Sequence, residues 1–195
     1  MTGAKIAKKY ENPIDNFIVH HLCEPISDNL YYYNVTPNMI TLLGFIISII
    51  GAISLYNYKI YQFMFLNTIS YYCDCLDGYM ARKYKLQTKF GDYFDHVTDN
   101  LQVVIIIGVL IIKYRIFYYP KLIIFSLGII GMLLITQGCQ EVLMKKENNS
   151  LMLTFTTKLC NKNIINNINI LRFFGAGTAQ FYVLIITYYL WFHIK

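Results

Sequence analysis

Apolar residues fill long runs along this chain, and polar residues gather at the ends of those runs. Five runs approach the roughly 20 residues that a helix needs to cross a bilayer. We expect spanning helices over about 39–56, 61–79, 101–112, 122–135 and 173–191. The third run reaches spanning length only if its helix begins upstream, near Gly91. The pattern predicts an all-α fold, an integral membrane helix bundle.

A polar connector, residues 141–171, separates the last two runs. Within it, residues 151–159 are apolar but too short to span a bilayer alone. This stretch is either an interfacial helix or part of a sixth span. We therefore expect five to six transmembrane helices.

The segment 13–27 has a different pattern, with apolar residues at helical spacing and polar residues between them. The apolar positions are Ile14, Phe17, Ile18 and Leu22. This pattern is typical of an amphipathic helix that lies on the membrane surface. Further on, Thr36 and Pro37 suit the N-cap and first position of the first spanning helix.

Composition supports a membrane protein and sets its size. Of 195 residues, 56% are hydrophobic and only 14% are charged, which is too little charge for the surface of a soluble domain. The length fits one domain, 1–195. The net charge of +6 could indicate nucleic acid, but no basic stripe with spaced aromatic residues is present. We therefore expect no nucleic-acid partner.

The basic residues flank the apolar runs, and their distribution predicts the topology. If the N-terminus is cytoplasmic, twelve of the 17 Lys and Arg residues fall on the cytoplasmic side and five on the other, which supports a cytoplasmic N-terminus.

The five cysteines show no metal-binding spacing, so we expect reduced thiols that pack as small hydrophobic side chains.

Five of the eleven acidic residues fall within one short stretch, 74–99. Asp74 and Asp77 are three residues apart, and Asp95 and Asp99 are four apart, so each pair shares a helix face. Two helices that meet here would bring four carboxylates together near the membrane surface, which is costly unless a cation binds. Oxygen ligands favour Mg²⁺ or Mn²⁺ over zinc, and Mg²⁺ indicates a phosphate-bearing substrate.

This stretch resembles the signature of the CDP-alcohol phosphatidyltransferase family, D-x-x-D-G-x-x-A-R-x8-G-x-x-x-D-x-x-x-D. All eight fixed positions match without a gap, and Pro37-Asn38-x-x-Thr41 resembles the family's start of the first span. The resemblance places the catalytic core at about 36–113. The matching residues of the signature are Asp74, Asp77, Gly78, Ala81, Arg82, Gly91, Asp95 and Asp99.

The resemblance implies an enzyme of phospholipid biosynthesis that moves a phospho-alcohol group from a CDP-linked donor to an alcohol hydroxyl and releases CMP. It implies two ions, Mg²⁺ or Mn²⁺, held by Asp74, Asp77, Asp95 and Asp99, with Asp99 also the candidate base. It further implies that the CDP moiety is bordered by Asn38, Thr41, Gly78, Ala81, Arg82 and Gly91. A homodimer and, in a eukaryote, the endoplasmic reticulum follow from the same resemblance. The apolar runs predict a multi-pass location, and the distribution of Lys and Arg places the active site at the cytoplasmic face.

The sequence around Asp92 and His96 bears on the substrate. An acid after Gly91 and a His after Asp95 resemble the members that transfer phosphocholine or phosphoethanolamine to diacylglycerol. Asp92 and His96 lie four residues apart and could form an acid–imidazole pair, with His96 as an alternative base. The other interpretation is that His96 only packs or caps at the interface.

The length points another way, because 195 residues are closer to the compact members that use CDP-diacylglycerol and a small polar alcohol such as inositol, serine or glycerol phosphate. His20, His21 or Arg172 could line a pocket for such an acceptor. Two further alternatives are a divalent-cation transporter, which predicts acids spread through several spans, and a non-catalytic homologue.

Overall fold

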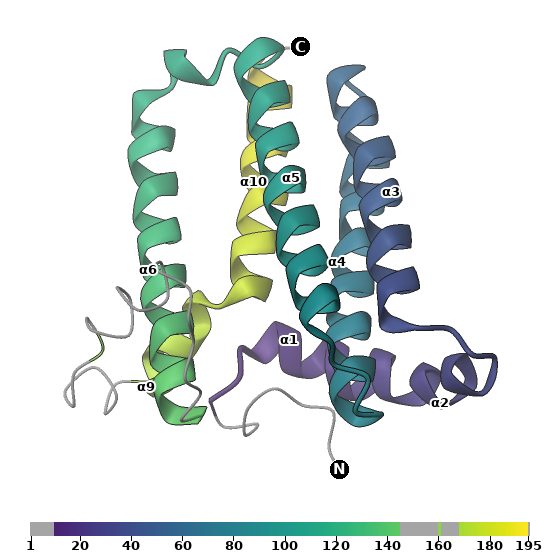
Figure 1. Cartoon of the computed structure of the whole chain (residues 1–195). Helices are drawn as coiled ribbons and strands as arrows, with labels where there is room; N and C mark the ends of the chain where they lie inside the picture. Colours follow the sequence, from purple (N-terminus) through teal and green to yellow (C-terminus); the bar gives the residue numbers. More distant parts are fainter. Residues whose placement is uncertain (1–9, 145–159, 161–167, 195) are drawn as a thin grey trace.

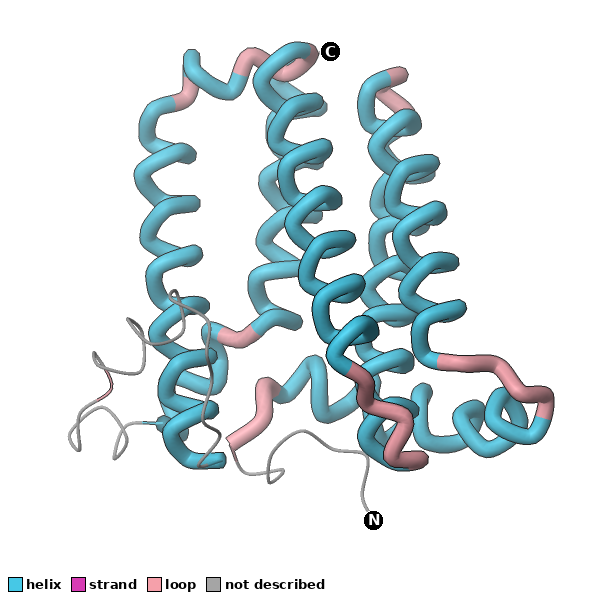
Figure 2. The backbone as a smooth tube through the Cα atoms, in the orientation of Figure 1, coloured by secondary structure: helices cyan, strands magenta, loops and turns pink. Residues whose placement is uncertain are grey.

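Five long helices run side by side and form the body of the computed structural model (Figure 1), which describes residues 10–144, 160 and 168–194. They are α3 (Pro37–Tyr56), α4 (Ile60–Lys83), α5 (Lys89–Ile112), α6 (Pro120–Met144) and α10 (Ala176–Ile194). The helices α3, α4, α5 and α6 each contain one of the predicted runs. The fifth helix, α10, begins three residues later than predicted, because a short 3-10 turn, η3 (Arg172–Phe174), and the extended Gly175 precede it. In the described part of the chain, Figure 2 shows helices and loops but no strand, so the all-α prediction is confirmed.

Three of these helices are long and apolar enough to cross a membrane among the residues that the structure describes: α3, α5 and the part of α6 from Pro120 to Gln140. The chain is therefore an all-α membrane bundle. The number of spans, five or six, stays a prediction. The apolar stretch 151–159, a candidate for the sixth span, lies outside the described residues.

Helix starts follow the local sequence closely. Thr36 has extended backbone angles and Pro37 is the first residue of α3, as predicted, although the Thr36 side chain makes no cap hydrogen bond. The helix α5 begins at Lys89, and the hydroxyl of Thr88 accepts a hydrogen bond from Gly91 N at 2.9 Å. This N-cap sets the start of α5 upstream of Gly91, which gives the third run its spanning length.

A short run of helix crosses the lower end of the bundle at a steep angle to the long helices (Figure 1). It consists of α1 (Pro13–Ile18), a π-helical turn η1 (Val19–Cys23) and α2 (Glu24–Tyr32). Val19, Cys23 and Ser27 are buried, whereas the predicted apolar positions Phe17 and Leu22 are 58% and 42% exposed. The surface helix thus packs on the bundle through one face and leaves part of its apolar face outward.

Polar contacts attach α2 to the end of α4. The ammonium of Lys83 lies 2.8 Å from an oxygen of Asp28 and 2.9 Å from Ser27 Oγ, and the hydroxyl of Tyr84 donates to Asp28 at 2.5 Å. The hydrogen bonds from Lys83 and then Tyr84 hold the pKa of the Asp28 carboxyl below its ordinary value. The ring of Tyr31 stacks on that of Tyr84. These contacts fix the surface helix beneath the loop that joins α4 to α5.

The prediction of reduced cysteines holds for three of the five, Cys23, Cys73 and Cys75. Cys23 and Cys73 are buried free thiols, and burial raises the pKa of the Cys23 thiol to about 12. Cys139 and Cys160, in contrast, form a disulfide, so the expectation of five reduced cysteines is wrong. The fold brings their Cα atoms to 5.3 Å although they are 21 residues apart, and their spacing along the chain gives no sign of this.

Close backbone approach joins α3 to α4. A Cβ atom on Gly44 would lie 2.9 Å from Cys73 Cβ, which is closer than real Cβ contacts allow. We expect Gly44→Val to lower the free energy of unfolding by about 1–3 kcal/mol, as overpacked sites do. Thermal unfolding in detergent measures the effect. Gly108→Val on α5 is the control, because a Cβ there meets nothing within 4 Å; an equal loss at both positions would contradict this account.

Candidate active site

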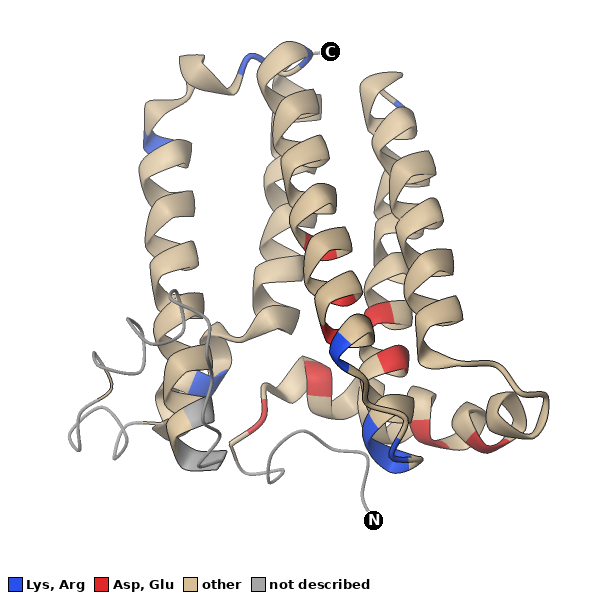
Figure 3. Ribbon diagram, in the orientation of Figure 1, with Lys and Arg blue, Asp and Glu red and all other residues tan. Residues whose placement is uncertain are grey.

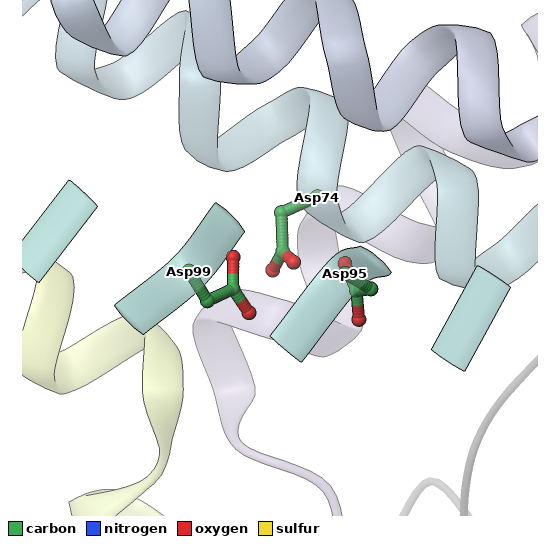
Figure 4. A group of neighbouring side chains, drawn as sticks. All are labelled: Asp74, Asp95 and Asp99. Atoms are coloured by element: carbon green, nitrogen blue, oxygen red, sulfur yellow. The ribbon is translucent and has the colours of Figure 1, made fainter. Parts of the chain in front are cut away.

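Three carboxylates from α4 and α5 point toward one another (Figure 4). Asp74 comes from α4, and Asp95 and Asp99 come from successive turns of α5. Each offers an oxygen within 4.8 Å of the others. The loop 84–88 is short enough to make the two helices antiparallel neighbours, so acids near the end of α4 meet acids near the start of α5. The two acidic segments meet as predicted, but the group holds three of the four expected carboxylates.

Asp77 is placed differently from the other three aspartates of the signature. It is only 4% exposed and accepts a hydrogen bond from Thr41 Oγ1 at 2.5 Å. Its carboxylate remains within electrostatic range of Asp74 and Asp95. The Thr41 hydroxyl also lies 3.2 Å from Pro37 O, within its own helix. Thr41 therefore connects α3 to the acidic site, and the metal-binding role of Asp77 stays a prediction.

We expect Thr41→Val to lower turnover by between about 10-fold and about 100-fold, because a hydrogen bond to a buried charged group is worth roughly 1.5–3 kcal/mol. Valine keeps the shape of threonine and removes only the donor to Asp77. CMP release under saturating donor measures the effect. Thr68→Val is the control, since the exposed Thr68 hydroxyl bonds only to Met64 O of its own helix at 2.8 Å. Equal activity of both variants would contradict a role for the Thr41 donor.

Arg82 lies over Gly78 on the last turns of α4. A Cβ atom on Gly78 would be 3.0 Å from Arg82 Nη1 and 3.5 Å from Nη2, so glycine leaves room for the guanidinium. Arg82 is also within electrostatic range of Glu11, Asp77 and Asp74. The signature arginine thus sits beside the carboxylates, with its planar fork able to pair with phosphate.

Gly91 gives a second place of close approach, between α3 and α5. A Cβ atom on Gly91 would lie 2.9 Å from Asn38 Oδ1 and 3.0 Å from Thr88 Oγ1. Asn38 therefore packs against the start of α5, one turn ahead of Asp95. Ala81 is half-buried on α4, and its carbonyl accepts a hydrogen bond from Leu86 N at 2.9 Å. Whether these residues border a nucleotide stays a prediction.

Asp92 and His96 lie on the first turns of α5, and both are exposed. Neither belongs to the converging group, which consists of Asp74, Asp95 and Asp99. Within the described residues the structure records no ion pair between Asp92 and His96. The acid–imidazole pair expected from their spacing is therefore not formed here, and a role for His96 as base stays a prediction.

Two sets of hydrogen bonds around the site were not predicted from the sequence. Ser70 Oγ lies 2.9 Å from Gly44 O and 3.2 Å from Gln102 Oε1, which joins α4 to α3 and α5. The hydroxyl of Tyr71 donates to Asp15 of the surface helix. Nothing in the spacing of these residues predicts the contacts. The one feature of the sequence that could have indicated these contacts is a polar residue inside an apolar run, as at Ser70 and Gln102.

The electrostatics of this end of the molecule favour a bound cation. Figure 3 shows acidic residues gathered on α1, α2, α4 and α5 at the lower end of the bundle, while the rest of the long helices is nearly free of charge. Three carboxylates within 4.8 Å repel one another, and repulsion is strongest where water is partly excluded. The donor set is all oxygen and fits a hard divalent cation such as Mg²⁺ or Mn²⁺.

Comparison with known proteins covers most of the chain. The sequence model of the CDP-alcohol phosphatidyltransferase family matches residues 34–192. These residues include the carboxylate group, all of α3 to α6 and all but the last two residues of α10. No solved structure gives a significant match to the chain.

Three relatives give shorter matches. The CDP-diacylglycerol–inositol 3-phosphatidyltransferase of Candida albicans is 35% identical over 85 residues, 42% of this chain and 36% of the relative. The archaetidylinositol phosphate synthase of Pyrococcus horikoshii is 28% identical over 98 residues, 50% and 47% of the two chains. The phosphatidylinositol phosphate synthase of Cutibacterium acnes is 32% identical over 77 residues, 39% and 37%. The matches thus span less than half the length of these curated relatives.

Proposed function

The chain belongs to the CDP-alcohol phosphatidyltransferase family, and from this premise we propose that it transfers a phosphatidyl group from CDP-diacylglycerol to a small polar alcohol, inositol or an inositol phosphate. The observation that carries the reaction class is the group of three carboxylates at signature positions 74, 95 and 99. The acceptor is supported by the names of the three relatives, each of which contains inositol. These names favour transfer from CDP-diacylglycerol to a small polar alcohol over transfer of phosphocholine or phosphoethanolamine to diacylglycerol.

The proposed reaction is one displacement at phosphorus. The acceptor oxygen attacks the phosphorus that carries diacylglycerol, the bond from that phosphorus to the bridging oxygen breaks, and CMP leaves with the bridging oxygen. The acceptor loses its hydroxyl proton to a base. Asp99 fills this role by resemblance to the family, and it lies within the converging group. His96, exposed one turn earlier on α5, is the alternative base.

Asp74, Asp95 and Asp99, with Asp77 nearby, would hold the divalent cations. Such ions supply positive charge at the pyrophosphate during phosphoryl transfer. Other residues position the groups of the site. Thr41 holds Asp77 in place, and Gly78 leaves room for Arg82, which would pair with the donor phosphates. Asn38, Ala81 and Gly91 are proposed to border the CDP moiety where α3, α4 and α5 meet.

Placement in the membrane follows from the proposed reaction. A diacylglycerol-linked donor lies in the bilayer with its nucleotide at the surface, and the carboxylates lie toward one end of α4 and α5 (Figure 3). We propose that this end faces the cytoplasm, where polar alcohols are available and CMP can be released, and that the protein is a multi-pass homodimer. The acids cluster at that one end among the described residues, whereas a transporter would carry them along a pathway.

A substrate panel tests the proposal. Purified protein with Mg²⁺ is supplied with CDP-diacylglycerol and, separately, inositol, inositol phosphate, serine or glycerol phosphate. Parallel reactions contain CDP-choline or CDP-ethanolamine with diacylglycerol. We expect CMP and an inositol lipid only with CDP-diacylglycerol and an inositol acceptor. Product from CDP-choline or CDP-ethanolamine would instead support the reading suggested by Asp92 and His96. No CMP from any donor would overturn the enzyme assignment.

A further inference from the structure

The segment just before the surface helix is anchored to the far end of the sequence. Asn12 is 1% exposed, and its Nδ2 lies 2.9 Å from both Arg172 O and Thr178 Oγ1. Its Oδ1 accepts from Ile14 N at 2.9 Å and caps α1. Gln140 Nε2 of α6 donates to Tyr10 O at 3.1 Å. Residues 10–15, named here the N-terminal bracket, thus bind both α6 and the start of α10.

Two glycines of the α10 region make this anchoring close and specific. A Cβ atom on Gly175 would lie 2.8 Å from Asn12 Cβ. A Cβ atom on Gly177 would lie 2.5 Å from Asp15 Oδ1 and 2.7 Å from Ile14 Cβ. The first turn of α10 therefore contacts the bracket with its backbone. An acidic side chain at this position is also favourable, since the N-terminus of a helix carries partial positive charge.

The same Asp15 also contacts α4. The hydroxyl of Tyr71 donates to Asp15 Oδ1. Tyr71 lies three residues before Asp74, on the same face of α4. One carboxylate of the bracket therefore joins the first turn of α10 to the turn of α4 that carries Asp74.

We propose that Asp15 and Tyr71 form a positioning pair that holds Asp74 at the distance from Asp95 and Asp99 that cation binding needs. Of the three converging carboxylates, Asp74 is the one that α4 contributes, so its placement depends on how the turn 71–74 is held. Mutual repulsion pushes this turn away from α5 when no cation is bound, and the bond to Asp15 resists that displacement. The proposal rests on the proposed function in assigning these carboxylates to cation binding.

Tyr71→Phe tests the pair, since it keeps the ring and removes the hydroxyl. We expect it to weaken Mn²⁺ binding by about 10-fold, the lower end of the loss that changes just outside the ligands of a metal site commonly cause. Binding is measured by electron paramagnetic resonance of free Mn²⁺. The Mg²⁺ concentration for half-maximal CMP release should rise by a similar factor, while the KM for donor at saturating Mg²⁺ stays within about twofold. Asp15→Ala should match Tyr71→Phe, and Asp15→Asn, which keeps an acceptor oxygen, should recover most of the affinity.

Tyr72→Phe is the matched control. Tyr72 is the next residue on α4, and its hydroxyl donates to Leu22 O of the surface helix at 3.3 Å. This bond also joins α4 to the surface helix, but Leu22 lies outside the N-terminal bracket, and we expect unchanged Mn²⁺ affinity. A Tyr71→Phe protein with lower thermal stability but wild-type Mn²⁺ affinity would overturn the pair, as would equal losses in both variants.

The two proposals fail in different ways. If the wild-type protein binds Mn²⁺ but releases no CMP from any donor, the proposed function fails, and the Mn²⁺ titrations of Tyr71→Phe still decide on the pair. If the wild-type protein binds no Mn²⁺, the positioning pair is overturned whatever the activity. The direct binding measurement therefore separates the outcomes.

Discussion

Replacing Asp95 with asparagine is expected to lower the rate of CMP release at least about 1,000-fold. Asp95 is one of three carboxylates that offer oxygens within 4.8 Å of one another. Asparagine keeps the size of the side chain and one oxygen but removes the negative charge. A cation in such a site supplies several kcal/mol of charge stabilisation, and each 1.36 kcal/mol corresponds to a tenfold change in rate. Asp74→Asn and Asp99→Asn should fall in the same range.

A stability measurement makes this prediction sharper. Removing one of three mutually repelling charges should leave the unfolding temperature of the cation-free protein equal to or above that of the wild type. Added Mn²⁺ should raise the unfolding temperature of the wild type and not of Asp95→Asn, because binding to the native state stabilises it. Asp28→Asn is the control, since Asp28 is exposed on α2 and pairs with Lys83. Full activity of Asp95→Asn would remove the metal assignment.

Chelation should reproduce the same loss without a mutation. With EDTA in excess over Mg²⁺, the wild-type protein is expected to stop releasing CMP, and added Mg²⁺ or Mn²⁺ should restore the rate. Asp95→Asn should gain nothing from the added ion. Activity that persists in EDTA would show that the carboxylates act without a cation.

Features that depend on neighbouring residues in the chain were predictable from the sequence. The apolar run after Thr36-Pro37 predicts the start of α3, and the spacing of Asp95 and Asp99 places both on one face of α5. Because α4 and α5 are joined by a short loop, their acidic ends had to be close. The sequence pattern was therefore enough to predict that Asp74 lies close to Asp95 and Asp99.

Features that depend on contacts between distant parts of the chain were not predictable. Asn12 and Arg172 are 160 residues apart, and no periodicity relates them. Likewise, the apolar face of the surface helix was visible, but hydrophobic spacing does not distinguish burial against protein from exposure to lipid. Phe17 faces outward, while Val19 and Cys23 pack on the bundle. Asp77 had the same sequence signal as Asp74, and only the fold shows that it pairs with Thr41.

Replacing Arg82 with lysine is expected to lower kcat/KM for the CDP-linked donor by about 100-fold, although the charge is kept. The guanidinium lies over Gly78, where a Cβ would meet both terminal nitrogens, and it is within electrostatic range of Asp77 and Asp74. A planar fork can bind two phosphate oxygens at once, whereas an ammonium is a single point of charge. Losing one charge-assisted hydrogen bond of roughly 1.5–3 kcal/mol accounts for a change of this size.

Two further variants separate geometry from charge at this position. Gly78→Val keeps Arg82 but pushes the guanidinium from its place, so it should show a loss in the same direction as Arg82→Lys. Lys85→Asn removes a nearby positive charge in the loop after α4, at a residue with φ of 57°, where asparagine is well tolerated; it should leave kcat/KM within about twofold. Because Arg82 is proposed to contact the donor and not the cation, Arg82→Lys should retain wild-type Mn²⁺ affinity, in contrast to Asp95→Asn. Weakened Mn²⁺ binding in Arg82→Lys would contradict this. It would show that the arginine holds the carboxylates in place and does not bind the donor phosphates.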